Sequence, residues 1–483
     1  MSTPRDASGR MPGVAEIRAV PAAAWRRACL DAHAHGERFG GLFSHLPASG
    51  PPRLRAVFST PAGERLITCE ATEGAVETIV DVIPAAGWDE REAHDLHAIS
   101  FIGHEPLRPL IDHHAPLEAW TVPTVGEDVH QVAVGPIHAG VIESGHFRFH
   151  VVGERILHLD VRLSYKRRGL ETAAAGRSLG DGIAYAQRAC AACAVTNTVA
   201  YAQACEAALG LQPDDHLRRA RTVLLELERV YNHLNDISAI CAGVGFAPGA
   251  MAYAALKERA QRLNERLAWH RFLFDTVSVG RSAISFDRQE AADARRELAA
   301  IGQEHQLVWR DLRFVSSLQE RLEGVATLSA ADAERLGAVG PAARASGLRD
   351  DHRIHSPHLS YSGFSVAVAE AASGDVAART NQRALELHQS LELLDDLLTQ
   401  PLEPGTVRRC GEEASTAVGR VESPRGVTVC VVVREGDRLA ALHLRTGSYA
   451  NWPVLAHAVV GELLPDFPLI NKSFELCYAC ADR

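Results

Sequence analysis

The stretch AYAQRACAACAVTNTVAYAQACE, residues 184–206, holds a Cys-x-x-Cys pair within a run of small, helix-favouring residues. After Ser178 the apolar residues recur with a helical period. The helices that this period predicts are 181–210, 215–242, 249–278, 286–324 and 376–400. Pro213 and Asp214 stand just before the second of them, where a helix commonly begins. The sequence therefore predicts a mostly helical domain built around this cysteine pair, with small β elements at its ends.

The residues ahead of this helical region have a different pattern. LRAVFST (54–60) and RLITCEA (65–71) alternate apolar and polar residues on either side of a turn, as strands do. A short acidic helix and a loop rich in Gly and Pro follow, and 112–128 has the composition of a linker. We therefore expect an α+β protein, with a small α/β domain at 1–120 and a second domain at 121–483.

Composition narrows the classes of function. The chain has 483 residues, 46% of them hydrophobic, with a formal net charge of -10. These values are typical of a globular protein and predict no nucleic-acid partner. The polar N-terminus lacks the apolar core of a secretory signal, and no apolar run is long enough to span a membrane. A cytoplasmic protein is expected.

Four of the ten cysteines form two Cys-x-x-Cys pairs, Cys190/Cys193 and Cys477/Cys480. This spacing lets two thiolates point at one ion, and thiolates suit soft transition metals. A redox dithiol is an alternative for the first pair, although no thioredoxin-like βαβ pattern surrounds it. The residues alone also leave open that the two pairs are unrelated thiols. The other six cysteines are expected to be small buried residues.

Several blocks along the chain resemble one family in the family's order. The first, WDEREAHDLHAISFIGHEPLRPL (88–110), resembles the small hydrophilic subunit of respiratory complex I. The others are VGPIHAGVIESGHFRF (134–149), LELERVYNHLNDISA (225–239), GPAARASGLRDDHR (340–353), VESPRG (421–426) and NWPVLAHAV (451–459). Together with the cysteine pairs they resemble the large subunit of energy-converting (group 4) nickel–iron hydrogenases, of the formate hydrogenlyase type. The resemblance runs from about residue 38 to Arg483.

The resemblance implies a Ni-Fe(CN)2(CO) centre, in which nickel is held by four thiolates and iron carries CO and cyanide. Cys190 and Cys477 would be terminal nickel ligands, and Cys193 and Cys480 would bridge the two metals. The family's proton-relay glutamate falls on Glu143, and the arginine beside the open nickel site falls on Arg425. His233 and Asp236, which share one face of a predicted helix, and His138 are candidates for the surroundings of the centre.

Arg167 stands where many members of the family have a histidine, and three further positions also depart from the family pattern. Ala191 replaces a glycine, and Asn197 replaces a histidine that usually donates a hydrogen bond to a bridging sulfur. Asparagine also donates, but its reach is shorter and it carries no positive charge. Glu475, followed by leucine, stands where the family has Asp-Pro. Such changes around a metal alter affinity or activity by about 10- to 100-fold, so they bear on the rate of H2 turnover.

Three functions follow from this resemblance. The first is the catalytic large subunit of a membrane-associated hydrogenase that interconverts H2 with protons and electrons. The second is a complex I-like subunit of NADH:quinone oxidoreductase, with a quinone cavity and no active Ni-Fe centre. The third is a metal-binding scaffold without H2 activity, and the departures at Ala191, Asn197 and Glu475 support it. Retention of all four cysteines favours a metal site over the quinone cavity of the second function.

The first function implies partners. They are a small subunit that carries the iron–sulfur clusters, membrane-arm subunits, maturation proteins, and an electron-donor module of the formate dehydrogenase or ferredoxin kind. The chain would then lie in the cytoplasm on the inner face of the cell membrane, and its N-terminal domain would serve for docking.

Overall fold

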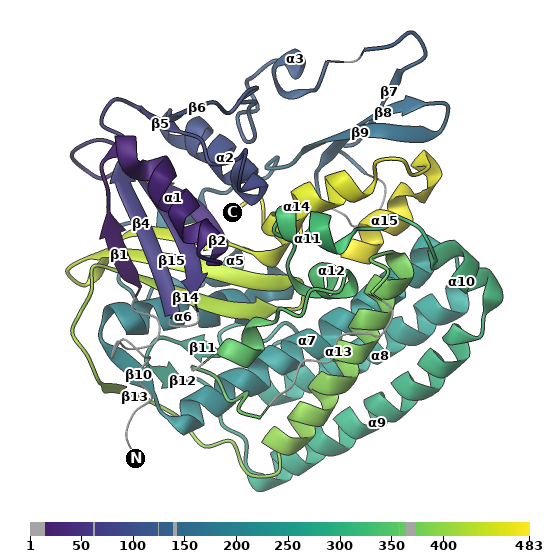
Figure 1. The fold of residues 1–483 in the computed structure, drawn as a ribbon. Helices are drawn as coiled ribbons and strands as arrows, with labels where there is room; N and C mark the ends of the chain where they lie inside the picture. Colours follow the sequence, from purple (N-terminus) through teal and green to yellow (C-terminus); the bar gives the residue numbers. More distant parts are fainter. Residues whose placement is uncertain (1–14, 61–62, 124, 139–142, 357, 364–371) are drawn as a thin grey trace.

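The computed structural model describes residues 15–483, apart from 61–62, 124, 139–142, 357 and 364–371. An N-terminal sheet with two helices lies against a second sheet, which in turn covers a group of long helices (Figure 1). The α+β class predicted from the sequence is confirmed. Among the described residues, no helix is both long enough and apolar enough to cross a membrane.

The N-terminal sheet has the order β1-β4-β3-β2. Its strands are β1 (Glu16–Ala19), β2 (Arg38–His45), β3 (Arg53–Thr60) and β4 (Gly63–Glu70). One face packs on α1 (Trp25–Ala34) through Trp25 and Phe58, both fully buried. The short pair β5 (Ala75–Glu77) and β6 (Ser100–Ile102) flanks α2 (Gly87–His97). The opposite face packs through Phe43 and Val57 on the second sheet, which fixes the N-terminal region to the rest of the chain.

Two further three-stranded sheets frame the helices. One holds β7 (His130–Val134), β8 (His146–Val152) and β9 (Arg155–Arg162). The other holds β14 (Thr416–Ser423), β15 (Gly426–Glu435) and β16 (Arg438–Arg445). β14 lies so close to α6 (Ala194–Ala208) that a Cβ at Gly419 would come within 1.9 Å of the Ala200 carbonyl oxygen. Only glycine allows this approach.

The helical core contains α7 (Asp215–Gly243), α8 (Ala247–Ala268), α9 (Arg288–Arg313) and α13 (Val376–Leu397). The Asp214 side chain accepts a hydrogen bond from the Leu217 amide and caps α7, as its position in the sequence predicts. α8 ends earlier than predicted, because Trp269 adopts a left-handed conformation. The helix predicted at 286–324 is two helices, which separate at Phe314 and Val315.

Shorter elements complete the chain. The helices are α3 (Leu117–Trp120), α4 (Leu170–Ala174), α5 (Ile183–Arg188), α10 (Ser316–Leu322), α11 (Ala330–Arg335), α12 (Gly340–Ala345), α14 (Gly447–Ala458) and α15 (Phe467–Phe474). The 3-10 turns are η1 (Ala22–Ala24), η2 (Pro84–Ala86), η3 (Ala191–Cys193), η4 (His352–His355) and η5 (Leu464–Asp466). The remaining strands are β10 (Leu211–Pro213), β11 (Val277–Ser278), β12 (Arg281–Ser282) and β13 (Val407–Arg409).

His305 on α9 makes the stability of the folded chain depend on pH. Its side chain is buried, and its Nδ1 lies 2.9 Å from the Tyr253 hydroxyl. Burial, reinforced by the nearby His388, lowers the pKa of His305 to about 4. The unfolded chain takes up this proton near pH 6.5, whereas the folded chain does not, so acidification favours unfolding. Between pH 7 and 5 the folded state should lose about 2 kcal/mol through this residue.

A His305→Phe variant keeps a ring in the core and removes the titrating group. Urea unfolding at pH 7 and at pH 5 should show a smaller loss of stability for this variant than for the parent chain. An equal loss in both proteins would mean that His305 does not carry this pH dependence.

Candidate metal centre

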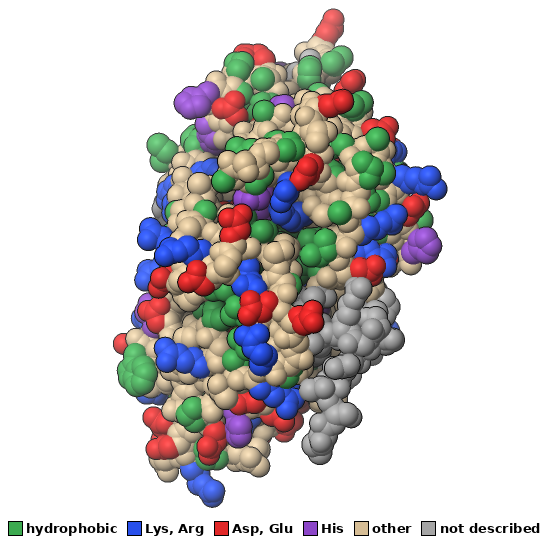
Figure 2. Space-filling view, turned by 90° about the vertical axis from the view of Figure 1, so that its left-hand side faces the viewer, with side chains coloured by type: hydrophobic (Ala, Val, Ile, Leu, Met, Phe, Trp, Pro, Cys, Tyr) green, Lys and Arg blue, Asp and Glu red, His purple; other side chains and the backbone are tan. Residues whose placement is uncertain are grey.

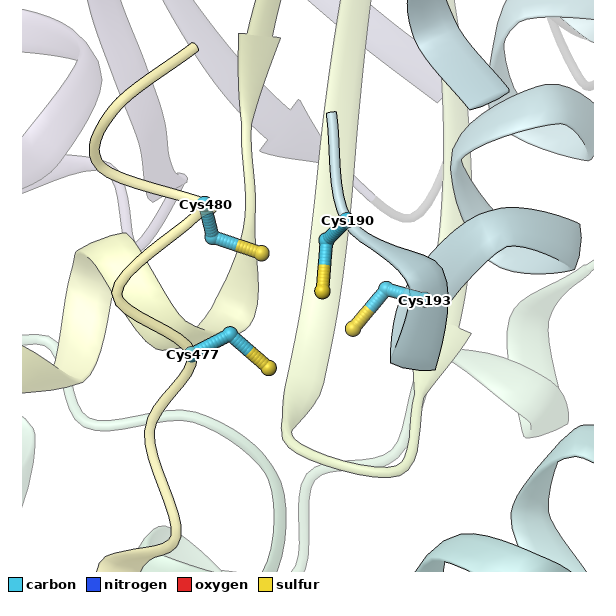
Figure 3. Close-up of side chains that lie close together, drawn as sticks. All are labelled: Cys190, Cys193, Cys477 and Cys480. Carbon is cyan, nitrogen blue, oxygen red and sulfur yellow. The ribbon is translucent and has the colours of Figure 1, made fainter. Parts of the chain in front are cut away.

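The two cysteine pairs meet at one point in the structure. The sulfur atoms of Cys190, Cys193, Cys477 and Cys480 all lie within 4.8 Å of one another. Figure 3 shows the first pair on the segment that leads into α6 and the second on the C-terminal segment, with all four side chains pointing toward a common space. Three of these residues are buried and Cys477 is half-buried. Convergence of pairs so distant in sequence is a property of the whole fold.

A break between α5 and α6 exposes the first pair to this space. Cys190 has extended backbone angles, φ -157° and ψ 130°, and η3 follows it. The single helix predicted at 181–210 is therefore wrong. Side chains from α7 hold the break open: the Asn232 amide and the Tyr231 hydroxyl both donate hydrogen bonds to the Ala192 carbonyl, at 2.8 and 3.3 Å.

Glu228, one turn before Asn232, caps the start of α6. Its carboxylate accepts hydrogen bonds from the backbone amides of Val195 and Thr196, at 2.7 and 3.1 Å, and from the Thr196 hydroxyl. Anionic oxygens are favourable at a helix N-terminus. Complete burial nevertheless raises the pKa of Glu228 to about 7.

Replacement of Glu228 by alanine should destabilise the chain, because the two amides and the hydroxyl lose their acceptor in a buried place. The expected cost is about 3 kcal/mol in the free energy of unfolding, measured by urea denaturation. Glu228→Gln keeps one acceptor oxygen and should lose less. A Glu228→Ala chain as stable as the parent would contradict the capping role.

The second pair lies on residues 475–483, which we name the C-terminal strap. α15 ends where Glu475 turns left-handed, with φ 48°. The Cys477 amide then donates a hydrogen bond to the Ser448 hydroxyl at 3.0 Å. The Tyr478 ring packs edge-on against Trp452, with ring centroids 5.0 Å apart. These contacts orient the strap toward α6.

Four neighbouring thiols share their protons unevenly. Hydrogen bonds from Cys190, Cys193 and Cys480 hold the pKa of Cys477 well below its usual range. The pKa of Cys193 rises well above its usual range, because this thiol donates to Cys190 and its other neighbours and is buried. Such a cluster of sulfur donors suits a soft or borderline metal ion.

Arg425 joins the strap to α7. It is buried, at 3% exposure, in the turn between β14 and β15. Its guanidinium donates to Asn232 Oδ1 at 2.6 Å, to Asp236 Oδ1 at 3.1 Å and to the Glu475 carbonyl at 2.7 Å. The negative charge of Asp236 and then of Cys477 contributes to a pKa of Arg425 well above its usual range, despite burial. The arginine therefore stays charged beside the cysteines.

The other predicted residues lie at different distances from the cluster. Asp236 binds both Arg425 and Arg383. The His233 ring lies between two carboxylates, with its Nδ1 3.8 Å from Asp236 and its Nε2 3.2 Å from Glu386. Asn197 is buried one turn into α6, and neither of its amide atoms has a hydrogen-bond partner among the described residues. His138 contacts the Gly145 carbonyl at 2.7 Å and is not among the residues that line the adjoining cavity.

A cavity of about 710 Å³ opens beside the cysteines. Cys190, Cys477, Arg425 and Glu143 all contribute to its wall. The structure thus places the predicted relay glutamate next to the candidate metal ligands. The charge of Glu143 also acts on Asp482: burial and then Glu143 raise the pKa of Asp482 to about 6.

Sequence reasoning missed several residues of this site. Asn232 was not among the predicted site residues, although it lies one helical turn before Asp236 and so faces the same way. Lys257 and Lys472, two of the three lysines in the chain, line the cavity. The face drawn in Figure 2 shows acidic and basic side chains intermixed, with no broad basic area among its described residues.

Known proteins resemble this chain in sequence and in fold. The family of the respiratory-chain NADH dehydrogenase 49 Kd subunit matches residues 244–414 and 406–483, and the family of the 30 Kd subunit matches 54–121. Formate hydrogenlyase subunit 5 of Escherichia coli is 28% identical over 86% of this chain and 78% of its own length. A subunit of the NADH-quinone oxidoreductase of Salinispora tropica is 31% identical over 70% of this chain and 89% of its own length.

A solved structure of the membrane-bound sulfane sulfur reductase, an archaeal respiratory membrane complex, superposes with a TM-score of 0.69 and 25% identity. The match covers 75% of this chain and 100% of that one. The matched families and relatives define this chain as an oxidoreductase subunit of the hydrogenase and complex I class. Within that class the chain belongs to the 49 Kd subunit family, with a 30 Kd-like region fused ahead of it, and is similar to group 4 hydrogenase large subunits.

Proposed function

We propose that this chain is the catalytic large subunit of a membrane-associated nickel–iron hydrogenase of the formate hydrogenlyase type. The observation that carries the proposal is the convergence of four sulfur atoms within 4.8 Å, beside a cavity that Glu143 and Arg425 also line. The donor set fits the metals, since thiolates are the ligands that soft and borderline ions prefer. The unpartnered amide of Asn197, one turn from Cys193, adds a polar group that a bound centre could engage.

In this proposal each residue has a definite task. The sulfur atoms of the four cysteines would hold the centre, Cys190 and Cys477 as ligands of nickel, and Cys193 and Cys480 as ligands shared with iron. When bound, the centre supplies the chemistry that interconverts H2 with two protons and two electrons. Glu143 accepts or returns the proton at its carboxylate oxygen. Arg425, held by Asp236 and Asn232, keeps a fixed positive charge at the cavity wall.

The assembly follows from the same proposal. Within the described ranges only one cluster of four cysteines exists, so the iron–sulfur clusters would belong to a small partner subunit. Membrane-arm subunits, maturation proteins and a formate dehydrogenase or ferredoxin-like donor module complete the set. Residues 1–120 would form the docking domain and 121–483 the catalytic domain, on the cytoplasmic face of the membrane. Formate hydrogenlyase and the archaeal respiratory membrane complex are the relatives that support such an assembly.

A second candidate function is that of a complex I-like subunit with a quinone-type cavity. The 31% identity to an NADH-quinone oxidoreductase subunit and the cavity of about 710 Å³ favour it. It leaves the four converging cysteines without a role, and for that reason we place it second.

Elemental analysis with infrared spectroscopy separates the two. The complex is produced with its partners and maturation proteins and purified without oxygen. One nickel per chain, with stretching bands of CO and cyanide, is the result that the first proposal requires. Absence of nickel and of these bands would reject it in favour of the quinone-type function or of a scaffold without H2 activity.

A further inference from the structure

The C-terminal strap contains a buried arginine. The Arg483 side chain is 4% exposed, three residues beyond Cys480. Its guanidinium lies 4.5 Å from the centroid of the Tyr449 ring and donates a long hydrogen bond, 3.5 Å, to the Cys480 carbonyl. A buried guanidinium is costly unless carboxylates pair with it. The partners of Arg483 therefore bear on where the strap can lie.

Two carboxylates from distant parts of the chain supply this pairing. Arg483 Nη2 donates to Glu92 at 2.8 Å, and Arg483 Nε donates to Glu171 at 2.8 Å. Glu171 is on α4, in the second of the two predicted domains. Glu92 is on α2, in the N-terminal 30 Kd-like region that the sequence assigns to docking.

Glu92 is itself fixed in place. It is buried at 6% exposure, and its carboxylate accepts hydrogen bonds from the Tyr449 hydroxyl at 2.7 Å and from Arg167 at 3.4 Å. The carboxylate thus faces Arg483 with little freedom to follow a displaced strap. Because the Glu92 carboxylate is held in place, its ion pair restrains the position of Arg483.

We propose that Glu92 is a positioning residue that latches the C-terminal strap, so that Cys477 and Cys480 are held opposite Cys190 and Cys193. Through this latch the N-terminal domain helps to assemble the metal site. The part that concerns nickel retention rests on the proposed function. The part that concerns the order of the strap does not.

Asp89 provides a matched control. It lies one helical turn before Glu92 on α2 and forms a buried ion pair with Arg445 of β16, 3.0 Å away, across the same interface. Its carboxylate also accepts a hydrogen bond from the Leu42 amide at 3.2 Å, and both partners lie outside the strap. Asp89→Ala therefore removes a comparable interdomain ion pair and leaves the Arg483 contacts intact.

The first experiment uses the full chain, purified with its partners from nickel-depleted medium. Hydrogen–deuterium exchange in peptides of 475–483 should be at least about ten times faster in Glu92→Ala than in the parent. Alkylation of Cys480, mapped by mass spectrometry, should rise in parallel. Asp89→Ala should leave both rates in the strap unchanged. Equal rates in Glu92→Ala and the parent, or equal acceleration by Asp89→Ala, would overturn the latch.

Glu92→Gln guards against a chain that fails to fold, because it keeps an acceptor oxygen and loses only the charge. Its exchange rate should fall between those of Glu92→Ala and the parent, and a rate equal to the parent's would again overturn the latch. In complexes grown with nickel, Glu92→Ala should retain several-fold less nickel than Asp89→Ala. If even the parent binds no nickel, the proposed function fails, while the exchange rates still decide on the latch.

Discussion

A complex that carries Cys477→Ser is expected to hold at least about ten times less nickel than the parent complex. The pKa of Cys477 lies well below its usual range, because the other three thiols donate hydrogen bonds to it. It is therefore a sulfur well prepared to bind a metal as a thiolate. A serine hydroxyl stays protonated near neutral pH and is a hard donor, so it does not replace a soft thiolate on nickel.

Nickel per chain, measured by elemental analysis, is the readout, and Cys410→Ser is the control. Cys410 is a half-buried cysteine outside the cluster, so its replacement changes the thiol count and leaves the centre intact. The control should bind nickel like the parent. Parental nickel content in Cys477→Ser would reject Cys477 as a ligand, and a matching loss in Cys410→Ser would show that the effect is not local.

The long helices could be predicted because their periodicity and caps agree. α7 and α13 begin within a residue of the predicted positions, and Asp214 marks the start of α7. The break at Cys190 could not be predicted in this way. The surrounding alanines favour a helix, and no glycine or proline interrupts the run. Contacts from α7, made by Asn232, Tyr231 and Glu228, impose the extended residue there.

The candidate site was predictable in parts. The Cys-x-x-Cys spacing identified the two cysteine pairs. That the pairs meet was indicated only by the family resemblance, because bringing together residues so far apart in sequence depends on the entire fold. The partners of Arg425 show the same limit. His233 and Asp236 were chosen as i, i+3 neighbours, and they do lie 3.8 Å apart, but the side chains that hold the guanidinium are Asn232 and Asp236, at i, i+4. No sequence pattern marked Glu92 as a site residue, because its partner Arg483 lies at the other end of the chain.

Glu143→Gln is expected to leave nickel content unchanged and to slow the exchange of D2 with solvent protons by about 10²- to 10⁴-fold, the usual contribution of a positioned proton carrier. Glu143 lines the cavity beside Cys190 and Cys477 and belongs to neither cysteine pair, so its amide should not disturb metal binding. Glutamine matches the size and polarity of glutamate, but it cannot take up or release a proton near neutral pH.

Glu475→Gln is the matched control, because Glu475 is another carboxylate on the wall of the same cavity. Its carboxylate faces Lys472 and Asn235. If both variants lose exchange equally, the negative charge of the cavity matters, and Glu143 is not the specific relay. Exchange at the parent rate in Glu143→Gln would reject the relay outright. Loss of exchange in Glu143→Gln alone, with nickel retained, would assign the proton to this side chain, because the cavity keeps its shape and its other charges.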